Sequence, residues 1–93
     1  MHPLLSRLIQ DLNWPHLTDM ASVEAHLATP GIHCLFIPGD PVRNLETADA
    51  AVILPELHIA FQRSFDCALV GDAIEAKLRE SHGVLKTPSF LFF

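Results

Sequence analysis

Apolar residues near the start of the chain recur at helical spacing and predict two helices. The first stripe consists of Leu4, Leu5, Leu8, Ile9 and Leu12. Pro3 suits the first turn of this helix, whereas Pro15 cannot continue it. Thr18 or Asp19 can cap a second, shorter helix. The apolar face of the second helix consists of Met20, Val23 and Leu27.

Two short apolar runs, 32–37 and 66–70, predict strands that are covered on both faces. Neither run alternates regularly between polar and apolar residues, and both are rich in residues that favour strands. The segment between them is long enough for a helix. Two strands joined in this way pair in parallel, with a right-handed crossover.

The helix between these strands is predicted to run from Ala50 to about Ser64. Asp49 or Thr47 is the expected cap. Pro55 lies inside the predicted helix, where it removes a backbone hydrogen bond and predicts a kink. The inward-facing residues are expected to be Ile53, Leu57, Ala60 and Phe61.

The last third of the chain predicts one more helix and a closing strand. Asp72 and Glu75 have the spacing of a capping box at a helix start, and Gly83 is a natural C-cap. The Thr87–Pro88 step then leads into an apolar strand that ends at Phe93 and expects cover on both faces. An X-Pro bond is also the one place where a cis peptide costs little.

Composition limits the classes of function. The chain has 93 residues, of which 49% are hydrophobic, so it can bury a core as one domain. Its net charge of −5 argues against nucleic-acid binding. No apolar run reaches the ~20 residues needed to span a bilayer, so membrane insertion is not expected. The N-terminus lacks the apolar core of a signal peptide, and the expected location is the cytoplasm.

Cys34 and Cys67 each lie inside an apolar run, which favours buried free thiols and a reducing compartment. A reactive thiol needs some exposure and a neighbouring positive charge or helix N-terminus. A thiol oxidoreductase that uses either cysteine is therefore the less favoured alternative.

No other catalytic, metal or cofactor site is expected from the residue spacing. The six histidines, at positions 2, 16, 26, 33, 58 and 82, form no pair with ligand spacing on one helix. Asp40, Glu46 and Asp49 surround one loop and could act in acid–base chemistry. A solvated loop with a helix cap is the favoured explanation, and there is no phosphate-binding glycine loop.

The order of predicted elements resembles thioredoxin. The likeness lies in the strand Cys34–Ile37, the proline-containing helix segment Ala51–Pro55 and the stretch Thr87–Phe92. The resemblance implies a cis-proline at Pro88, facing the start of the helix. The redox Cys-x-x-Cys box would fall on Thr47–Ala50, where both cysteines are missing, so redox activity is not expected.

A narrower resemblance is to the HyaE/HupG/HoxO-type hydrogenase expression proteins, which are thioredoxin-like but lack the redox cysteines. It rests on Asn13-Trp14, Gly39–Arg43, Leu57–Phe61, Gly71–Gly83 and Pro88–Phe92. It implies a non-enzymatic chaperone that holds the small-subunit precursor of an uptake nickel–iron hydrogenase, with its twin-arginine signal peptide, before export. The hypothetical partner-binding residues are Thr47, Asp49, Thr87 and Pro88.

The resemblance also implies elements beyond Phe93. The expected fold class is an α/β thioredoxin-like sandwich with a mixed central sheet flanked by helices, spanning residues 1–93 and truncated before the last strand and the C-terminal helix. An open apolar sheet edge favours association. A homo-oligomer through this strand, or an assembly subunit unrelated to hydrogenase, is the alternative to the chaperone hypothesis.

Overall fold

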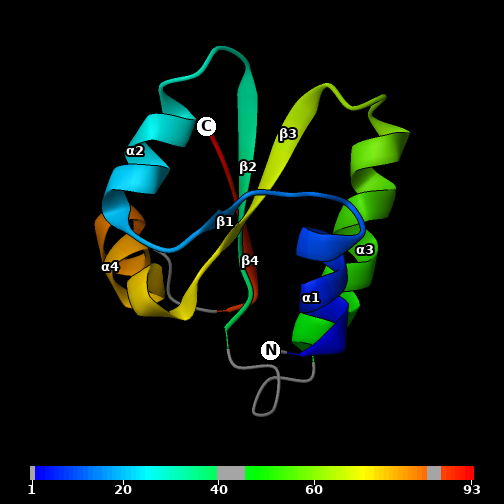
Figure 1. The fold of residues 1–93 in the computed structure, drawn as a ribbon, viewed down its shortest axis with the longest axis horizontal. Coiled ribbons are helices and arrows are strands. Elements are labelled where there is room, and N and C mark those ends of the chain that lie inside the picture. The colour runs from blue at the N-terminus through cyan, green and yellow to red at the C-terminus, as the bar shows by residue number, and fades with distance from the viewer. Residues whose placement is uncertain (1, 40–45, 84–86) are drawn as a thin grey trace.

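Four helices and four strands form the part of the chain that the computed structural model describes, namely residues 2–39, 46–83 and 87–93 (Figure 1). The helices are α1 (Pro3–Gln10), α2 (Met20–Leu27), α3 (Glu46–Ala60) and α4 (Asp72–His82). The strands are β1 (His16–Leu17), β2 (Ile32–Ile37), β3 (Phe65–Val70) and β4 (Ser89–Phe92). The expected α/β class is confirmed.

The four strands form one mixed sheet in the order β1-β3-β2-β4. β3 pairs in parallel with both β1 and β2, and β4 pairs antiparallel to β2. The predicted parallel pairing of the two apolar strands is therefore confirmed. The sequence analysis missed β1, because two residues directly after Pro15 are too short to show a period.

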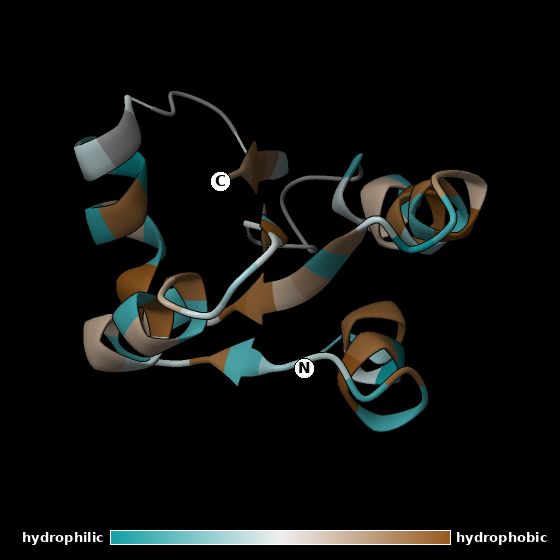
Figure 2. Cartoon of the chain, turned by 90° about the horizontal axis from the view of Figure 1, so that it is seen from above, coloured by the Kyte–Doolittle hydropathy of each residue, from teal (hydrophilic) through white to brown (hydrophobic). Residues whose placement is uncertain are grey.

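Helices cover both faces of the sheet, with α1 and α3 on one face and α2 and α4 on the other (Figures 1 and 2). Side chains alternate along β2. Cys34 and Phe36 join the core under α1 and α3, whereas Leu35 and Ile37 join the core under α2 and α4. This arrangement explains why β2 shows no polar alternation, since both of its faces are buried.

The predicted capping residues can be compared with the structure at three helix ends. Asp19 caps α2, and its carboxylate accepts a hydrogen bond from the backbone N–H of Ser22 at 2.7 Å. Gly83 ends α4 in the left-handed conformation, with φ of 66°. α4 starts at Asp72 as predicted, but the predicted capping box was wrong, because the N-cap is Gly71 and no described side chain caps this end.

The prediction for α3 needs two corrections. The helix begins at Glu46, so Thr47 and Asp49 lie within its first turns and do not cap it at Ala50. The inward face was also wrong, because Ile53, Ala60 and Phe61 are exposed and Leu57 is only half-buried. The buried residues are Thr47, Ala51, Leu54 and Pro55. The apolar run through the middle of this helix carries no clear helical period, so it could not indicate which face is buried.

β4 is less covered than predicted: Ser89, Phe90 and Leu91 are half-buried and Phe92 is exposed. It lies at one edge of the described sheet. Within the described ranges, no helix combines the length and the apolar character needed to cross a bilayer.

Candidate functional site

A groove lies where the start of α3 meets the start of β4. It has a volume of about 260 Å³. Its lining consists of Glu46, Asp49, Ala50, Ile53, Pro88, Ser89 and Phe90. The groove therefore joins two segments that are about forty residues apart in the sequence. β4 pairs with β2, and Phe36 of β2 shares a core with Ala51 and Leu54 of α3.

The groove combines an apolar floor with two carboxylates. Phe90 packs edge-to-face against the buried Phe36, with 5.4 Å between the ring centroids. Ile53 leaves 51% of its surface exposed and so offers apolar surface at the groove. Glu46 and Asp49 are the acidic residues of the first turn of α3, where they also complement the helix dipole. This surface suits a partner that is both apolar and positively charged.

Of the four residues predicted to bind a partner, two line the groove and two do not. Asp49 and Pro88 line the groove. Thr47 is completely buried, and its hydroxyl donates to the carbonyl oxygen of Pro38 at 2.6 Å. Thr87 is half-buried and lies against Gly39. The Thr87–Pro88 peptide bond is cis, as the resemblance implied.

Of the three carboxylates predicted around one loop, the structure brings two to the same surface. Glu46 and Asp49 are separated by three positions in the first turn of α3, which places them next to each other on one helix face. Asp40 lies outside the described residues. The two described carboxylates face an apolar groove and not a polar, enclosed site.

The two cysteines are neighbours in the sheet, because Cys34 is the register partner of Cys67 across β2 and β3. Both are free thiols and buried, with 0% and 3% of their surfaces exposed. A hydrogen bond to Cys34 and burial raise the pKa of the Cys67 thiol far above its ordinary value. A neutral, inaccessible thiol is a poor nucleophile.

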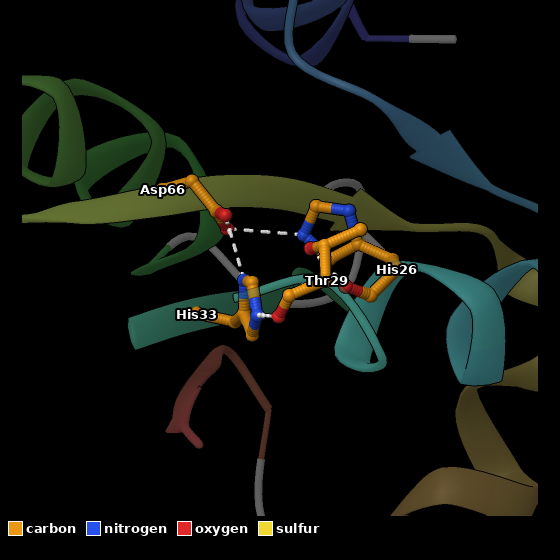
Figure 3. A network of polar contacts seen from close by, with 4 residues as sticks. All are labelled: His26, Thr29, His33 and Asp66. Carbon is orange, nitrogen blue, oxygen red and sulfur yellow. Dashed lines mark hydrogen bonds and ion pairs between the residues drawn. The ribbon is translucent and has the colours of Figure 1, made fainter. Parts of the chain in front are cut away.

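The sequence analysis missed a cluster formed by His26, His33 and Asp66 (Figure 3). The Asp66 carboxylate lies 2.6 Å from Nδ1 of His33 and 3.0 Å from Nε2 of His26. The hydrogen bond to the Thr29 carbonyl is the main cause that raises the pKa of His33, and Asp66 adds to it against the effect of burial. No local spacing signals the cluster, because its members come from α2, β2 and β3.

The fold and the groove define the class of protein as a mixed α/β sandwich with a surface groove and no accessible thiol among the described residues. The sequence matches the family "Hydrogenase-1 expression protein HyaE" over residues 4–93. The chain therefore belongs to the HyaE family of hydrogenase expression proteins.

Two curated relatives agree with this assignment. The hydrogenase expression/formation protein HupG of Rhodobacter capsulatus is 60% identical over 99% of this chain and 67% of its own length. The hydrogenase expression/formation protein HoxO of Azotobacter vinelandii is 40% identical over 99% of this chain and 61% of its own length. Both relatives are named for the expression or formation of a hydrogenase.

The fold is also similar to a solved structure. A crystal structure from Rhodopseudomonas palustris, described as a hydrogenase expression/formation protein hupG, aligns with a TM-score of 0.72 and 42% identity. The alignment covers 82% of this chain and 69% of that chain. The mixed sheet flanked by helices is therefore a fold that this chain shares with a hupG protein.

Proposed function

We propose that this chain is a chaperone for hydrogenase maturation. In this proposal it is a thioredoxin-like module without redox cysteines, which binds the small-subunit precursor of an uptake nickel–iron hydrogenase and its twin-arginine signal peptide before export. The family membership supports a role in maturation. The observation that carries the binding step is the groove, in which Glu46 and Asp49 stand beside the apolar side chains of Ile53 and Phe90.

The groove suits a peptide in which a basic segment is followed by an apolar one. Guanidinium groups pair with carboxylates through two parallel hydrogen bonds, which gives both direction and strength. Ile53 and Phe90 offer apolar surface to the residues that follow the arginines. The volume of about 260 Å³ is below the range of about 300–1,000 Å³ for small-molecule sites. It suits a few side chains of a peptide better than a cofactor.

The thioredoxin-like part of the proposal rests on the arrangement around Pro88. Pro55 lies within α3, and Pro88 lies in the groove beside the first turns of that helix. The resemblance places a redox box at this position, and here Thr47-Ala48-Asp49-Ala50 occupies it. We interpret the corner as a binding surface for a polypeptide and not as a redox centre.

A non-catalytic role fits the cysteines as well. An oxidoreductase needs an accessible thiolate to attack a disulfide. Cys34 and Cys67 are buried side by side in the sheet, and the raised pKa of Cys67 keeps its thiol neutral. Neither cysteine is available for exchange in the folded protein.

The test is a calorimetric titration of the untagged chain with a hydrogenase small-subunit precursor, with its isolated signal peptide and with the mature subunit. The expected result is binding of the precursor and the signal peptide. Replacing the arginine pair of the peptide with two glutamines should weaken binding by about tenfold or more, because each charge-assisted hydrogen bond contributes about 1.5–3 kcal/mol. Absence of binding to both the precursor and the mature subunit would overturn the proposal.

Variants locate the binding surface. Asp49→Asn and Glu46→Gln remove one negative charge each from the groove with little change of shape, and both should weaken binding. Glu80→Gln is the matched control, because Glu80 is exposed on α4, on the opposite face of the sheet. Equal loss of affinity in all three variants would indicate a general charge effect and would exclude the groove as the site.

A further inference from the structure

The cluster of His26, His33 and Asp66 is positioned by the backbone of three elements. His33 and Asp66 are register partners in the parallel strands β2 and β3. Their neighbours Cys34 and Cys67 face the core under α1 and α3, so His33 and Asp66 project toward α2 and α4. The last turn of α2 contributes His26 to the same place (Figure 3).

The spacing of the three side chains suits one metal ion. One ligand atom from each residue lies within 4.8 Å of the other two. In a tetrahedral zinc site, bonds of about 2.0–2.2 Å place neighbouring ligand atoms roughly 3.3 Å apart. The Asp66 oxygens are 2.6 Å and 3.0 Å from the two imidazole nitrogens. A small outward movement of the carboxylate therefore makes room for an ion between the three groups.

The second nitrogen of His33 selects the tautomer that a metal requires. Nε2 lies 2.8 Å from the carbonyl oxygen of Thr29, which can only accept, so this nitrogen carries a hydrogen and donates. In the neutral ring the lone pair is then on Nδ1, which faces Asp66. Metal-binding histidines commonly donate their other N–H to a carbonyl or carboxylate in this way.

The backbone of His33 is held as firmly as its ring. Its N–H donates to the carbonyl of Phe93 at 2.9 Å, and its carbonyl accepts from the N–H of Phe93 at 2.8 Å. A ligand that is fixed before binding loses little conformational freedom when the ion arrives.

Burial and charge also favour a cation at this place. The exposed fractions of the side chains are 3% for His33, 15% for His26 and 46% for Asp66. Two imidazoles thus form the inner side of the cluster, and a carboxylate on the outer side leaves a path for water as a fourth ligand. The carbonyl groups at the end of α2 add negative potential near His26.

From this geometry we propose that His26 Nε2, His33 Nδ1 and one oxygen of Asp66 bind a single divalent transition-metal ion, with Zn²⁺ as the best match to two imidazoles and a carboxylate. The site lies at the amino ends of β2 and β3, whereas the groove lies near the carboxyl end of β2, where Ile37 pairs with Ser89. It is independent of the proposed chaperone function, and each can fail without the other.

The first test uses the untagged chain after treatment with a chelator and its removal. Calorimetric titration with Zn²⁺ should give one ion per chain. Nitrogen NMR of the histidine rings should then report metal on Nε2 of His26 and on Nδ1 of His33, with the hydrogen retained on Nε2 of His33. Absence of Zn²⁺ binding, or unchanged signals of both rings at saturation, would overturn the proposal without any need for a variant.

Variants provide the second test. His26→Gln and Asp66→Asn each remove a ligand and should weaken Zn²⁺ binding by at least about tenfold. His58→Gln is the matched control, because His58 packs against Trp14 and Phe65, away from the cluster. Circular dichroism in chelator checks that each variant is folded. Folded variants that all bind Zn²⁺ like the parent chain would place the ion elsewhere and contradict the proposal.

Discussion

Gly39 packs directly against Thr87, and this contact joins the end of β2 to the segment that leads into β4. A Cβ at position 39 would overlap both Oγ1 and Cβ of Thr87. Rotation of the threonine side chain moves the hydroxyl but not the Cβ. The backbone of one of the two segments must therefore shift to relieve the overlap. Gly39 also has φ of +75°, and its N–H donates to the carboxylate of Glu75 at 3.0 Å.

We predict that Gly39→Ala lowers the free energy of unfolding by about 2–4 kcal/mol. The left-handed conformation contributes about 1–2 kcal/mol of this loss, and overpacking against Thr87 contributes the remainder. Chemical denaturation monitored by circular dichroism measures the change.

Gly83→Ala is the matched control for this prediction. Gly83 has a similar φ of +66°, but among the described residues no atom outside its chain neighbours lies within 4 Å of the position that a Cβ would take there. Its substitution should cost only the conformational part, about 1–2 kcal/mol. Equal losses at the two glycines would show that the contact with Thr87 contributes nothing.

The bounds of the two central strands could be predicted from the sequence more accurately than the buried faces of the helices. β2 was predicted with its observed bounds, because a short, mostly apolar run between a glycine and a proline has few other interpretations. The buried face of α3 was not, because its central residues are apolar on all sides. There only the position of β2 and β3 decides that Leu54 is buried and Ile53 exposed.

The candidate sites depend on contacts that no local pattern encodes. Asp49 and Pro88 were predicted because a family resemblance placed them together, and both line the groove. The cluster around Asp66 was missed because it requires the register of His33 opposite Asp66. Sequence spacing reveals metal ligands on one helix or loop, but not ligands on neighbouring parallel strands.

The buried cysteines predict a chain that is inert toward thiol reagents. In native buffer at neutral pH, Cys34 and Cys67 should react with Ellman's reagent far more slowly than a free thiol, because both are buried and the pKa of Cys67 is raised. In denaturant both should react at once. Fast labelling of the native protein, or insulin reduction that is lost in a Cys67→Ser variant, would support the oxidoreductase alternative.

The raised pKa of His33 predicts how the stability of the metal-free protein depends on pH. The groups that face its ring are the Thr29 carbonyl, Asp66 and His26. Since the pKa of His33 is raised in the folded state, its stabilising contribution is complete below the unfolded pKa of about 6.5. The contribution is lost as the pH rises through the higher pKa of the folded protein.

Urea denaturation in chelator at a series of pH values measures this effect. The free energy of unfolding of the parent chain should fall as the pH rises above about 6.5. Asp66→Asn removes the charge that favours the protonated ring, and the fall should become smaller in that variant. A parent chain whose stability rises over the same interval would contradict the assigned direction of the pKa shift.

We expect substitutions of Thr47 and Asp49 to have different effects on stability and on peptide affinity, although both residues were predicted to bind the partner. Thr47→Val keeps the shape but leaves the buried carbonyl of Pro38 without the hydroxyl that donates to it. This loss should lower the free energy of unfolding by about 1–3 kcal/mol and leave the affinity for a signal peptide unchanged. Asp49→Asn should weaken peptide binding, because Asp49 is exposed at the groove, and should cost only the helix-dipole contribution to stability, about 0.3–1 kcal/mol. Denaturation and peptide titration of both variants separate the two roles, and a loss of affinity in folded Thr47→Val would require this buried residue to become accessible on binding.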